Sequence, residues 1–397
     1  MAEMSKADWN RAIEKLLEDD NKLKGMVSVM RDERTDPQKI PVLNRLVTED
    51  LIRHFGEAVG DPNPLWRDPN YARNTRWGSI IAPPTFDRAI GHSVVVLLQP
   101  IGRIPGWLGY YGGTKRVHLK PIRPGDKFRA VDKYLGITEK SNPAKPYRFF
   151  FQSNERSFIN QRDEVVVISI GYTTNTAIPP GEKDSMTKSV FAGRERHHFT
   201  KEELDFIHHA YEEEIEGKWR QGAEVRYWED VVEGDELHPV IKGPLDISDT
   251  VSFLAAVGMA WEGGFAMKWK MIKATANDAL IDPVSGEYHA PIDMHYLDSI
   301  ARQNGVPWAY ATGVQNEANL AHLVTNWMGD DGFVKRSDFS HRALLFMGDM
   351  STQKGKVRKK YVENGEHLVD LEIWGETQDG IRHTIGNVTV RLVSRAK

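Results

Sequence analysis

The sequence predicts an α+β protein made of two similar units, in each of which an antiparallel sheet wraps around one long helix. A short helical segment that starts near a Thr or Ser cap and ends at a glycine occurs in each half, at 47–60 and again at 246–258. A Gly-Asp pair follows in each half, at 125–126 and 348–349, with alternating strand-like sequence after it. Each half also has one longer helical stretch, so an internal duplication is the simplest interpretation.

The individual elements follow from hydrophobic periodicity. The chain opens with an amphipathic helix in which Trp9, Ile13, Leu16 and Leu17 share one side. The long helices are expected at about 85–98 and 314–327. Strands are expected at 127–135, 148–153, 165–172, 369–374 and 387–392. Because a lone sheet leaves an open strand edge, we expect the two sheets to join edge to edge.

The division into units follows from a breaker-rich stretch and a charged helix between the halves. Residues 178–183 contain consecutive prolines and a glycine, and 200–219 read as a charged helix. We therefore expect an N-terminal unit with its leading helix at 1–190, a helical linker at 191–221 and a second unit at 222–397. The segment 259–288 has no counterpart in the first half, and its aromatic and methionine residues suggest a pocket shaped for a bulky group.

Composition excludes several classes of function. The 397 residues carry a formal net charge of −4, which argues against a general nucleic-acid binder. There is no cysteine, so disulfides, thiolate metal sites and cysteine nucleophiles are excluded. The N-terminus lacks the apolar core of a signal peptide, and no apolar run is long enough to span a bilayer. We expect a cytoplasmic protein that binds neither membrane nor nucleic acid.

The most informative motif runs from Gly60 to Ala72 and reads GDPNPLWRDPNYA. It continues through Gly78 to the Ala-Pro-Pro-Thr that opens the first long helix. Prolines and an asparagine make this an ordered turn, which holds Asp61 on a rigid loop just before the helix.

This motif resembles the hydratase signature of the MaoC-like acyl-CoA dehydratases and hydratases. In that signature an Asp, an Asn-Pro, an apolar residue and a His precede an Asp and an aromatic-Ala pair, and a Gly and an Ala-Pro then lead into a helix. The resemblance continues through the Pro-Gly-Asp at 124–126 to the Trp-Met-Gly-Asp at 327–330. It implies a double hot-dog fold, in which two antiparallel sheets each wrap a long central helix.

The family's catalytic pair is the Asp and the His of the signature, and each half keeps a different part of it. Asp61 and Asn63 match the first half of the motif, but Trp66 stands where the His should be. An indole has no proton-accepting nitrogen and cannot act as a general base. In the second half His295 matches the His, whereas Ala290 replaces the Asp.

The resemblance implies a hydro-lyase that hydrates a 2-enoyl-CoA or dehydrates a 3-hydroxyacyl-CoA, with coenzyme A as part of the substrate and no other cofactor or metal. The expected catalytic residues are His295 as base, Asp293 or Asp298 as its acidic partner, Gly313 as a backbone oxyanion donor, and Asp61. Substrate contacts are expected from Asn63, Trp66, Tyr310, Lys335 and Arg336.

We expect the second half to carry the chemistry and the first half mainly to shape the acyl pocket. Pro83 and Pro84 remove two backbone donors from the entrance of the first long helix, whereas Gly313 keeps its N–H in the second. Asp61 would matter less, unless it reaches across into a composite site.

Two other functions fit the same motifs. One is an acyl-CoA thioesterase, because hot-dog folds also host hydrolysis. The other is an acyl-CoA binding protein without catalysis, because neither half keeps the full pair. Two fused copies imitate a hot-dog dimer, and we expect a homodimer of the chain.

Overall fold

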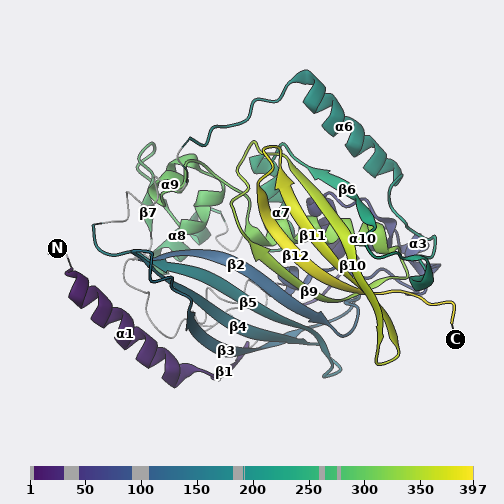
Figure 1. The fold of residues 1–397 in the computed structure, drawn as a ribbon, viewed down its shortest axis with the longest axis horizontal. Coiled ribbons are helices and arrows are strands. Elements are labelled where there is room, and N and C mark those ends of the chain that lie inside the picture. Colours follow the sequence, from purple (N-terminus) through teal and green to yellow (C-terminus); the bar gives the residue numbers. More distant parts are fainter. Residues whose placement is uncertain are drawn as a thin grey trace.

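A computed structural model describes residues 4–30, 44–91, 107–181, 191, 193–258, 264–274 and 279–396. Ten of the strands in these residues form one antiparallel sheet in the order β1-β3-β4-β5-β2-β9-β12-β11-β10-β6, and β7 (Leu280–Ile281) and β8 (Tyr288–His289) form a separate two-stranded sheet (Figure 1). The first half contributes β1 (Val27–Met30), β2 (Trp107–His118), β3 (Arg129–Glu139), β4 (Arg148–Ile159) and β5 (Val165–Ala177). The second contributes β6 (Glu236–Lys242), β9 (Phe333–His341), β10 (Ser351–Glu363), β11 (Glu366–Thr377) and β12 (Arg382–Arg391). All five predicted strand segments lie within or overlap these strands.

The two half-sheets meet at the antiparallel pair of β2 and β9. Gly113 pairs with Ser340 and Val117 with Arg336, and the Lys115 ammonium lies 2.9 Å from the Asp338 carboxylate across this seam. The predicted edge-to-edge junction is therefore confirmed, and it removes one open edge from each half-sheet.

The duplication is visible in matched backbone hydrogen bonds. Gly125 N–H donates to Val47 O in the first half, and Gly348 N–H donates to Leu245 O in the second. At the entrance of each central helix, Ala82 N–H donates to Ile122 O and Ala311 N–H donates to Leu345 O. These pairs put Ala82 and Ala311 at equivalent positions, so the two halves share one backbone frame.

The central helix of the second half is α10 (Gly313–Met328), as predicted. Thr312 caps it by accepting a hydrogen bond from Gln315 N–H, and every residue from Val314 to Met328 is buried. In the first half the described part of the corresponding helix is α4 (Asp87–Ile90), and residues 92–98 of the predicted helix lie outside the described residues.

The other helices cover the sheet edges and the ends of the central helices. The leading helix α1 (Lys6–Leu23) buries Trp9, Ile13 and Leu16, as its periodicity predicts. The repeated short helices are α2 (Glu49–Val59) and α7 (Ile247–Ala256), which meet where Phe55 and Phe253 lie 5.9 Å apart. Asp246, not Ser248, caps α7, because its carboxylate accepts from Ser248 N–H. The remaining short elements are η1 (Pro64–Trp66), α3 (Pro69–Arg73), η2 (Trp228–Asp230), α8 (Ala266–Ala274), β7 (Leu280–Ile281), β8 (Tyr288–His289), η5 (Pro291–His295) and α9 (Asp298–Gln303).

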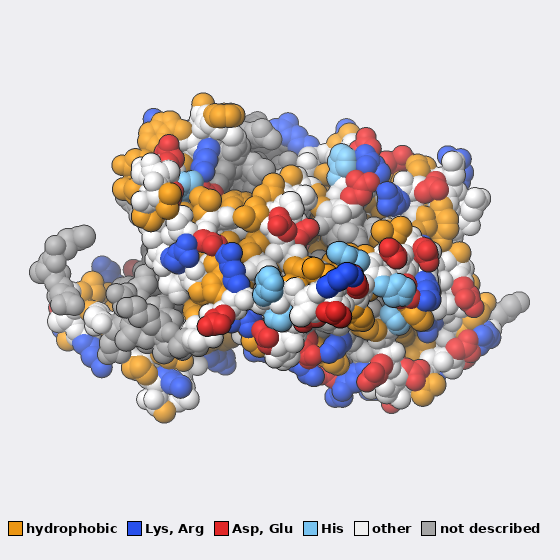
Figure 2. All heavy atoms as spheres, turned by 90° about the horizontal axis from the view of Figure 1, so that it is seen from above, with side chains coloured by type: hydrophobic (Ala, Val, Ile, Leu, Met, Phe, Trp, Pro, Cys, Tyr) orange, Lys and Arg blue, Asp and Glu red, His pale blue; other side chains and the backbone are white. Residues whose placement is uncertain are grey.

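The segment between the halves contains helix α6 (Lys201–Glu216), which begins with a capping box at Thr200 and Glu203. The helix lies along the outside of the second half (Figure 1). Acidic, basic and histidine side chains intermingle on the face seen from its side (Figure 2). Among the described residues, no helix has the length and apolar character needed to cross a bilayer.

Candidate active site

His295 ends the turn η5 in the second half, at the position where η1 ends with Trp66 in the first half. Its Nδ1 lies 2.8 Å from the carbonyl oxygen of Tyr310. A carbonyl only accepts, so Nδ1 carries the hydrogen and Nε2 presents a lone pair. Burial of the ring lowers the pKa of His295 to about 4, which keeps the imidazole neutral at pH 7. His295 is therefore held in the form that can accept a proton.

Burial lowers the pKa of His295 and the nearby charge of Asp293 acts against it, but both acids expected beside His295 also have other partners. Asp293 is buried, with the Lys268 ammonium 2.9 Å from its carboxylate and His289 Nδ1 in contact with the same oxygen. Asp298 accepts from Ala309 N–H at 3.0 Å and pairs with Arg196 at 2.6 Å. Asp298 therefore fixes the backbone that leads into α10, and Asp293 joins the turn to the inserted helix α8.

Gly313 opens α10 three residues after Tyr310. The first N–H groups of a helix lack partners within it, so this end of α10 offers donors to an anionic oxygen. A side chain at Gly313 would place its Cβ 2.6 Å from Tyr111 Cδ1 and 2.7 Å from His341 Nε2, which only glycine avoids. The backbone of α10 is thereby brought close to the seam between the two half-sheets.

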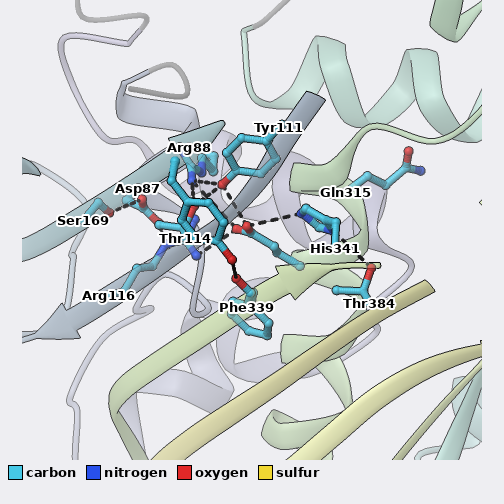
Figure 3. Close-up of polar contacts among 12 residues, drawn as sticks. Asp87, Arg88, Tyr111, Thr114, Arg116, Ser169, Gln315, Phe339, His341 and Thr384 are labelled. Carbon is cyan, nitrogen blue, oxygen red and sulfur yellow. Dashed lines mark hydrogen bonds and ion pairs between the residues drawn. The ribbon is translucent and has the colours of Figure 1, made fainter. Parts of the chain in front are cut away.

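A buried polar network fills the seam beside Gly313 (Figure 3). Arg116 pairs with Asp87 and with Glu317, at 2.8 Å in each case. Tyr111 donates to Glu317 at 2.8 Å, and Arg88 lies 3.8 Å from the same carboxylate. Burial acts to raise the pKa of Glu317, but its interactions with Arg116, His341 and Arg88 lower this pKa to about 2. Two positive and two negative side chains thus balance at the junction of the halves.

In the first half, the signature loop turns Asp61 toward the second half. Asp61 Oδ2 accepts from Trp66 Nε1–H at 2.8 Å, and Oδ1 accepts from Asn63 N–H at 3.0 Å. Asn63 caps η1 by accepting from Leu65 N–H. All three side chains are buried, so Trp66 acts here as a donor that orients a carboxylate.

The partner of Asp61 across the junction is His322 of α10, which the sequence did not single out. His322 Nε2 lies 3.5 Å from Asp61 Oδ1 and 3.1 Å from Glu214 Oε1 of α6. Lys242 of β6 contacts His322 Nδ1 at 2.8 Å. One signal was available in the sequence. The central helix carries polar residues on every side, so its histidine has to be buried and needs polar partners.

Two neighbouring pockets lie on either side of the turn at Pro83 and Pro84, which line both. The smaller, of about 210 Å³, is lined by Asp61 and His322 together with Phe55, Gly56, Val59, Pro83, Pro84, Ala318, Ala321 and Thr325. The larger, of about 460 Å³, is lined by Trp66 and His118 and continues to β9 at Phe333 and Val334. Asp61 therefore borders a cavity shared by both halves.

Lys335 and Arg336 lie on β9, each beside an acidic side chain. Lys335 Nζ is 2.9 Å from Glu366, and Arg336 is 3.1 Å from Glu363. A phosphate of coenzyme A would have to compete with these carboxylates. Among the described residues, no group of three or more His, Asp or Glu side chains is arranged to hold a metal ion.

The two candidate centres lie at different points of α10. His295 lies against Tyr310, ahead of the helix, whereas Asp61 faces His322. From Gly313 to His322 is nine residues, or about 14 Å along a helix. The structure thus brings Asp61, Asn63 and Trp66 together at one centre, and His295, Tyr310 and the start of α10 at another.

Comparison with known proteins identifies the first half at the sequence level. Residues 38–169 match the family model of the FAS1-like dehydratase domain region. A UPF0336 protein of Streptomyces avermitilis is 37% identical over 83 residues, which are 20% of this chain and 55% of the relative. A UPF0336 protein of Saccharopolyspora erythraea is 35% identical over 92 residues, 21% of this chain and 56% of the relative. The chain thus spans about half the length of these curated relatives.

Solved structures match nearly the whole chain in fold. A MaoC-like dehydratase superposes with a TM-score of 0.62 at 15% identity, covering 94% of this chain and 99% of the other. A conserved hypothetical protein of Mycobacterium tuberculosis with a double hot-dog fold gives a TM-score of 0.52 at 12% identity, with coverages of 93% and 96%. The resemblance drawn from the sequence is confirmed at two levels: residues 38–169 match the FAS1-like dehydratase region, and the chain as a whole has the double hot-dog fold that it shares with a MaoC-like dehydratase.

Proposed function

We propose that the protein reversibly hydrates a 2-enoyl-CoA thioester, or dehydrates the corresponding 3-hydroxyacyl-CoA, at the second-half site. The observation that carries the proposal is the fixed tautomer of His295. Its Nδ1–H is bound to Tyr310 O, so a neutral Nε2 is presented just ahead of the first turn of α10. A base and backbone N–H donors for the enolate oxygen are the two devices that this reaction requires.

In the hydration direction, Nε2 of His295 takes a proton from water while the water oxygen bonds to C3 of the enoyl group. The π electrons of the C2–C3 bond move toward the thioester carbonyl, whose oxygen becomes an enolate. The imidazolium then returns its proton to C2, the carbonyl re-forms, and the imidazole is neutral again. Water is added across the double bond with no other reactant. Dehydration is the same path in reverse.

The start of α10 stabilises the enolate. The N–H groups of Gly313 and Val314 are the donors left for it, because those of Gln315 and Asn316 already bond to Thr312. They lie at the positive end of the helix dipole. Loss of a single oxyanion donor typically costs 10²–10³ in kcat. Asp298 contributes indirectly, because its bond to Ala309 N–H holds the segment from which Tyr310 presents its carbonyl.

The test is a panel of 2-enoyl-CoA and 3-hydroxyacyl-CoA thioesters of increasing chain length, incubated in ¹⁸O-labelled water and read by mass spectrometry. Gain or loss of water with ¹⁸O at C3 is expected. Release of free coenzyme A would instead identify a thioesterase, and an unchanged panel would identify a binding protein. His295→Gln should lower the rate with the best substrate by about 10²-fold or more, because a general base contributes 10²–10⁴.

We also propose that the chain works in the cytoplasm as a homodimer. The chain has a mass of 45.1 kDa, so light scattering at micromolar concentration should give about twice that value. A mass equal to that of one chain would refute the dimer.

A further inference from the structure

We propose that Asp61 and His322 form a second acid–base centre, which hydrates 2-enoyl thioesters with a short acyl group; the reaction class rests on the proposed function. The centre is composite, since Asp61 comes from the first half and His322 from the central helix of the second. It replaces the imidazole that the first half lost when Trp66 took its place in the signature.

The carboxylate of Asp61 is held in one orientation by two donors. Trp66 Nε1–H binds Oδ2 at 2.8 Å and Asn63 N–H binds Oδ1 at 3.0 Å. Oδ1 is also the oxygen that faces His322 Nε2, at 3.5 Å. Asp61 and His322 are only 4% and 2% exposed, so the pair lies in a site from which bulk water is largely excluded.

Lys242 sets the tautomer of His322. The three hydrogens of an ammonium group match its three acceptors, which are Val59 O at 2.7 Å, Gly60 O at 3.1 Å and His322 Nδ1 at 2.8 Å. Nδ1 therefore accepts, and Nε2 carries the hydrogen. That hydrogen is donated to Glu214 Oε1 at 3.1 Å, and Asp61 Oδ1 is the second carboxylate oxygen near this nitrogen, at 3.5 Å. His322 is thus held ready to donate a proton, and Asp61 to accept one.

The cavity beside the pair is the right place for the reacting water. Of its volume of about 210 Å³, only about 10 Å³ is free for the centre of a water-sized molecule, so it holds about one water, and its wall is mostly apolar. Only the end of a short acyl group can approach the pair from there. The neighbouring pocket across Pro83 and Pro84 has about 30 Å³ of such free space.

Two buried polar groups near these pockets have no hydrogen-bond partner among the described residues. His118 Nε2 lies in the wall of the larger pocket, and Thr85 Oγ1 belongs to the residue after Pro84 and lines neither pocket. Thr85 is 1% exposed and its φ is 73°, a conformation that β-branched residues rarely adopt. Buried groups of this kind cost free energy unless a ligand satisfies them. His118 Nε2, in the wall of the larger pocket, is therefore the group that a ligand there could satisfy.

The proposed step balances within the pair and Lys242. Asp61 takes a proton from water as the oxygen bonds to C3, and the π electrons move toward the thioester oxygen. His322 Nε2–H gives its proton to C2 while Lys242 passes a proton to Nδ1, so that no imidazolate forms. The proton on Asp61 then passes to Nε2 and the Nδ1 proton returns to Lys242, which restores all three groups. Glu214 competes with Asp61 for the Nε2 hydrogen, so the linker helix α6 takes part in positioning the imidazole.

The test uses the full-length His295→Gln protein and crotonyl-CoA, a four-carbon enoyl thioester. A residual hydration rate is expected in this background, and adding Asp61→Asn or His322→Gln should lower its kcat by at least about 10²-fold. His383→Gln is the matched control, since His383 is equally buried but lies on β12. Trp66→His should restore part of the rate lost in His322→Gln, because it returns an imidazole to Asp61. No residual rate, or a residual rate that neither substitution changes, would overturn the proposal.

A binding readout separates this proposal from the proposed function. Butyryl-CoA, which is saturated and cannot be hydrated, should shift the ¹⁹F resonance of fluorotryptophan-labelled Trp66. Ala321→Leu should abolish that shift, because it fills the small pocket without changing a charge. If the wild type adds water to no thioester of the panel, the hydro-lyase function fails. An unchanged Trp66 resonance would show that the thioester does not bind beside Trp66. That result would overturn this proposal independently of the activity at His295.

Discussion

Glu317→Gln offers a direct measure of the buried charge network at the seam. Glu317 is fully buried and faces Arg116 at 2.8 Å and Arg88 at 3.8 Å. In the native protein these two arginines are balanced by Glu317 and Asp87. The substitution keeps the shape of the side chain but leaves two guanidinium groups with one carboxylate. An uncompensated positive charge then remains in the interior.

Removing one member of a buried ion pair typically costs about 3–5 kcal/mol, because the remaining charge loses its compensation without regaining water. We expect Glu317→Gln to lower the free energy of unfolding by about that amount. Arg88→Met leaves the opposite imbalance and should also destabilise. The double variant restores neutrality between Arg116 and Asp87, so its loss should be clearly smaller than the sum of the two single losses.

Urea-induced unfolding of the four proteins, followed by tryptophan fluorescence, gives the double-mutant cycle. Lys115→Met is the surface control, since the Lys115–Asp338 pair is half exposed and should contribute no more than about 1 kcal/mol. A Glu317→Gln loss below about 1 kcal/mol, or strictly additive losses in the double variant, would show that charge balance does not stabilise the seam.

Three further outcomes are expected. Gly313→Ala should cost about 1–3 kcal/mol and slow hydration, because its Cβ would lie 2.6 Å from Tyr111; an unchanged melting temperature would contradict the close approach. Thr85→Val should leave stability unchanged or slightly raised, since the hydroxyl has no partner among the described residues; a clear loss would mean that it is satisfied. The kcat/KM of the wild type should fall as pH drops toward 4, because protonation removes the base form of His295, whose pKa is about 4; an acid limb near pH 6.5 would refute this environment.

The fold could be predicted because its signals are local. Caps, Gly-Asp turns and alternating strands act within a few residues, and both copies carry them in the same order. The Gly125 and Gly348 turns form the matched backbone bonds that the repeat indicated. The same reasoning identified α10 to within one residue at each end.

The site could be predicted only where it follows the signature. Asp61, Asn63 and Trp66 are indeed joined by hydrogen bonds, since they lie within one loop. His322 was missed because its contact with Asp61 depends on how the two halves pack, which no local pattern encodes. Asp293 and Asp298 were expected beside His295 from sequence spacing alone. The charge of Asp293 does act on the His295 ring, and both carboxylates also have other partners, which sequence spacing does not reveal.

Fusion of the two copies explains why opposite charges can meet at the seam. Arg88 and Glu317 each lie six residues beyond the equivalent alanines, Ala82 and Ala311. In a symmetric dimer of identical hot-dog subunits, equivalent residues that face one another are necessarily alike, so two arginines or two glutamates would repel. A single chain is free of that constraint and can place a guanidinium opposite a carboxylate. The same freedom lets one half supply a carboxylate at Asp61 while the other supplies the imidazole of His322, which two identical subunits could achieve only by keeping both groups in each copy.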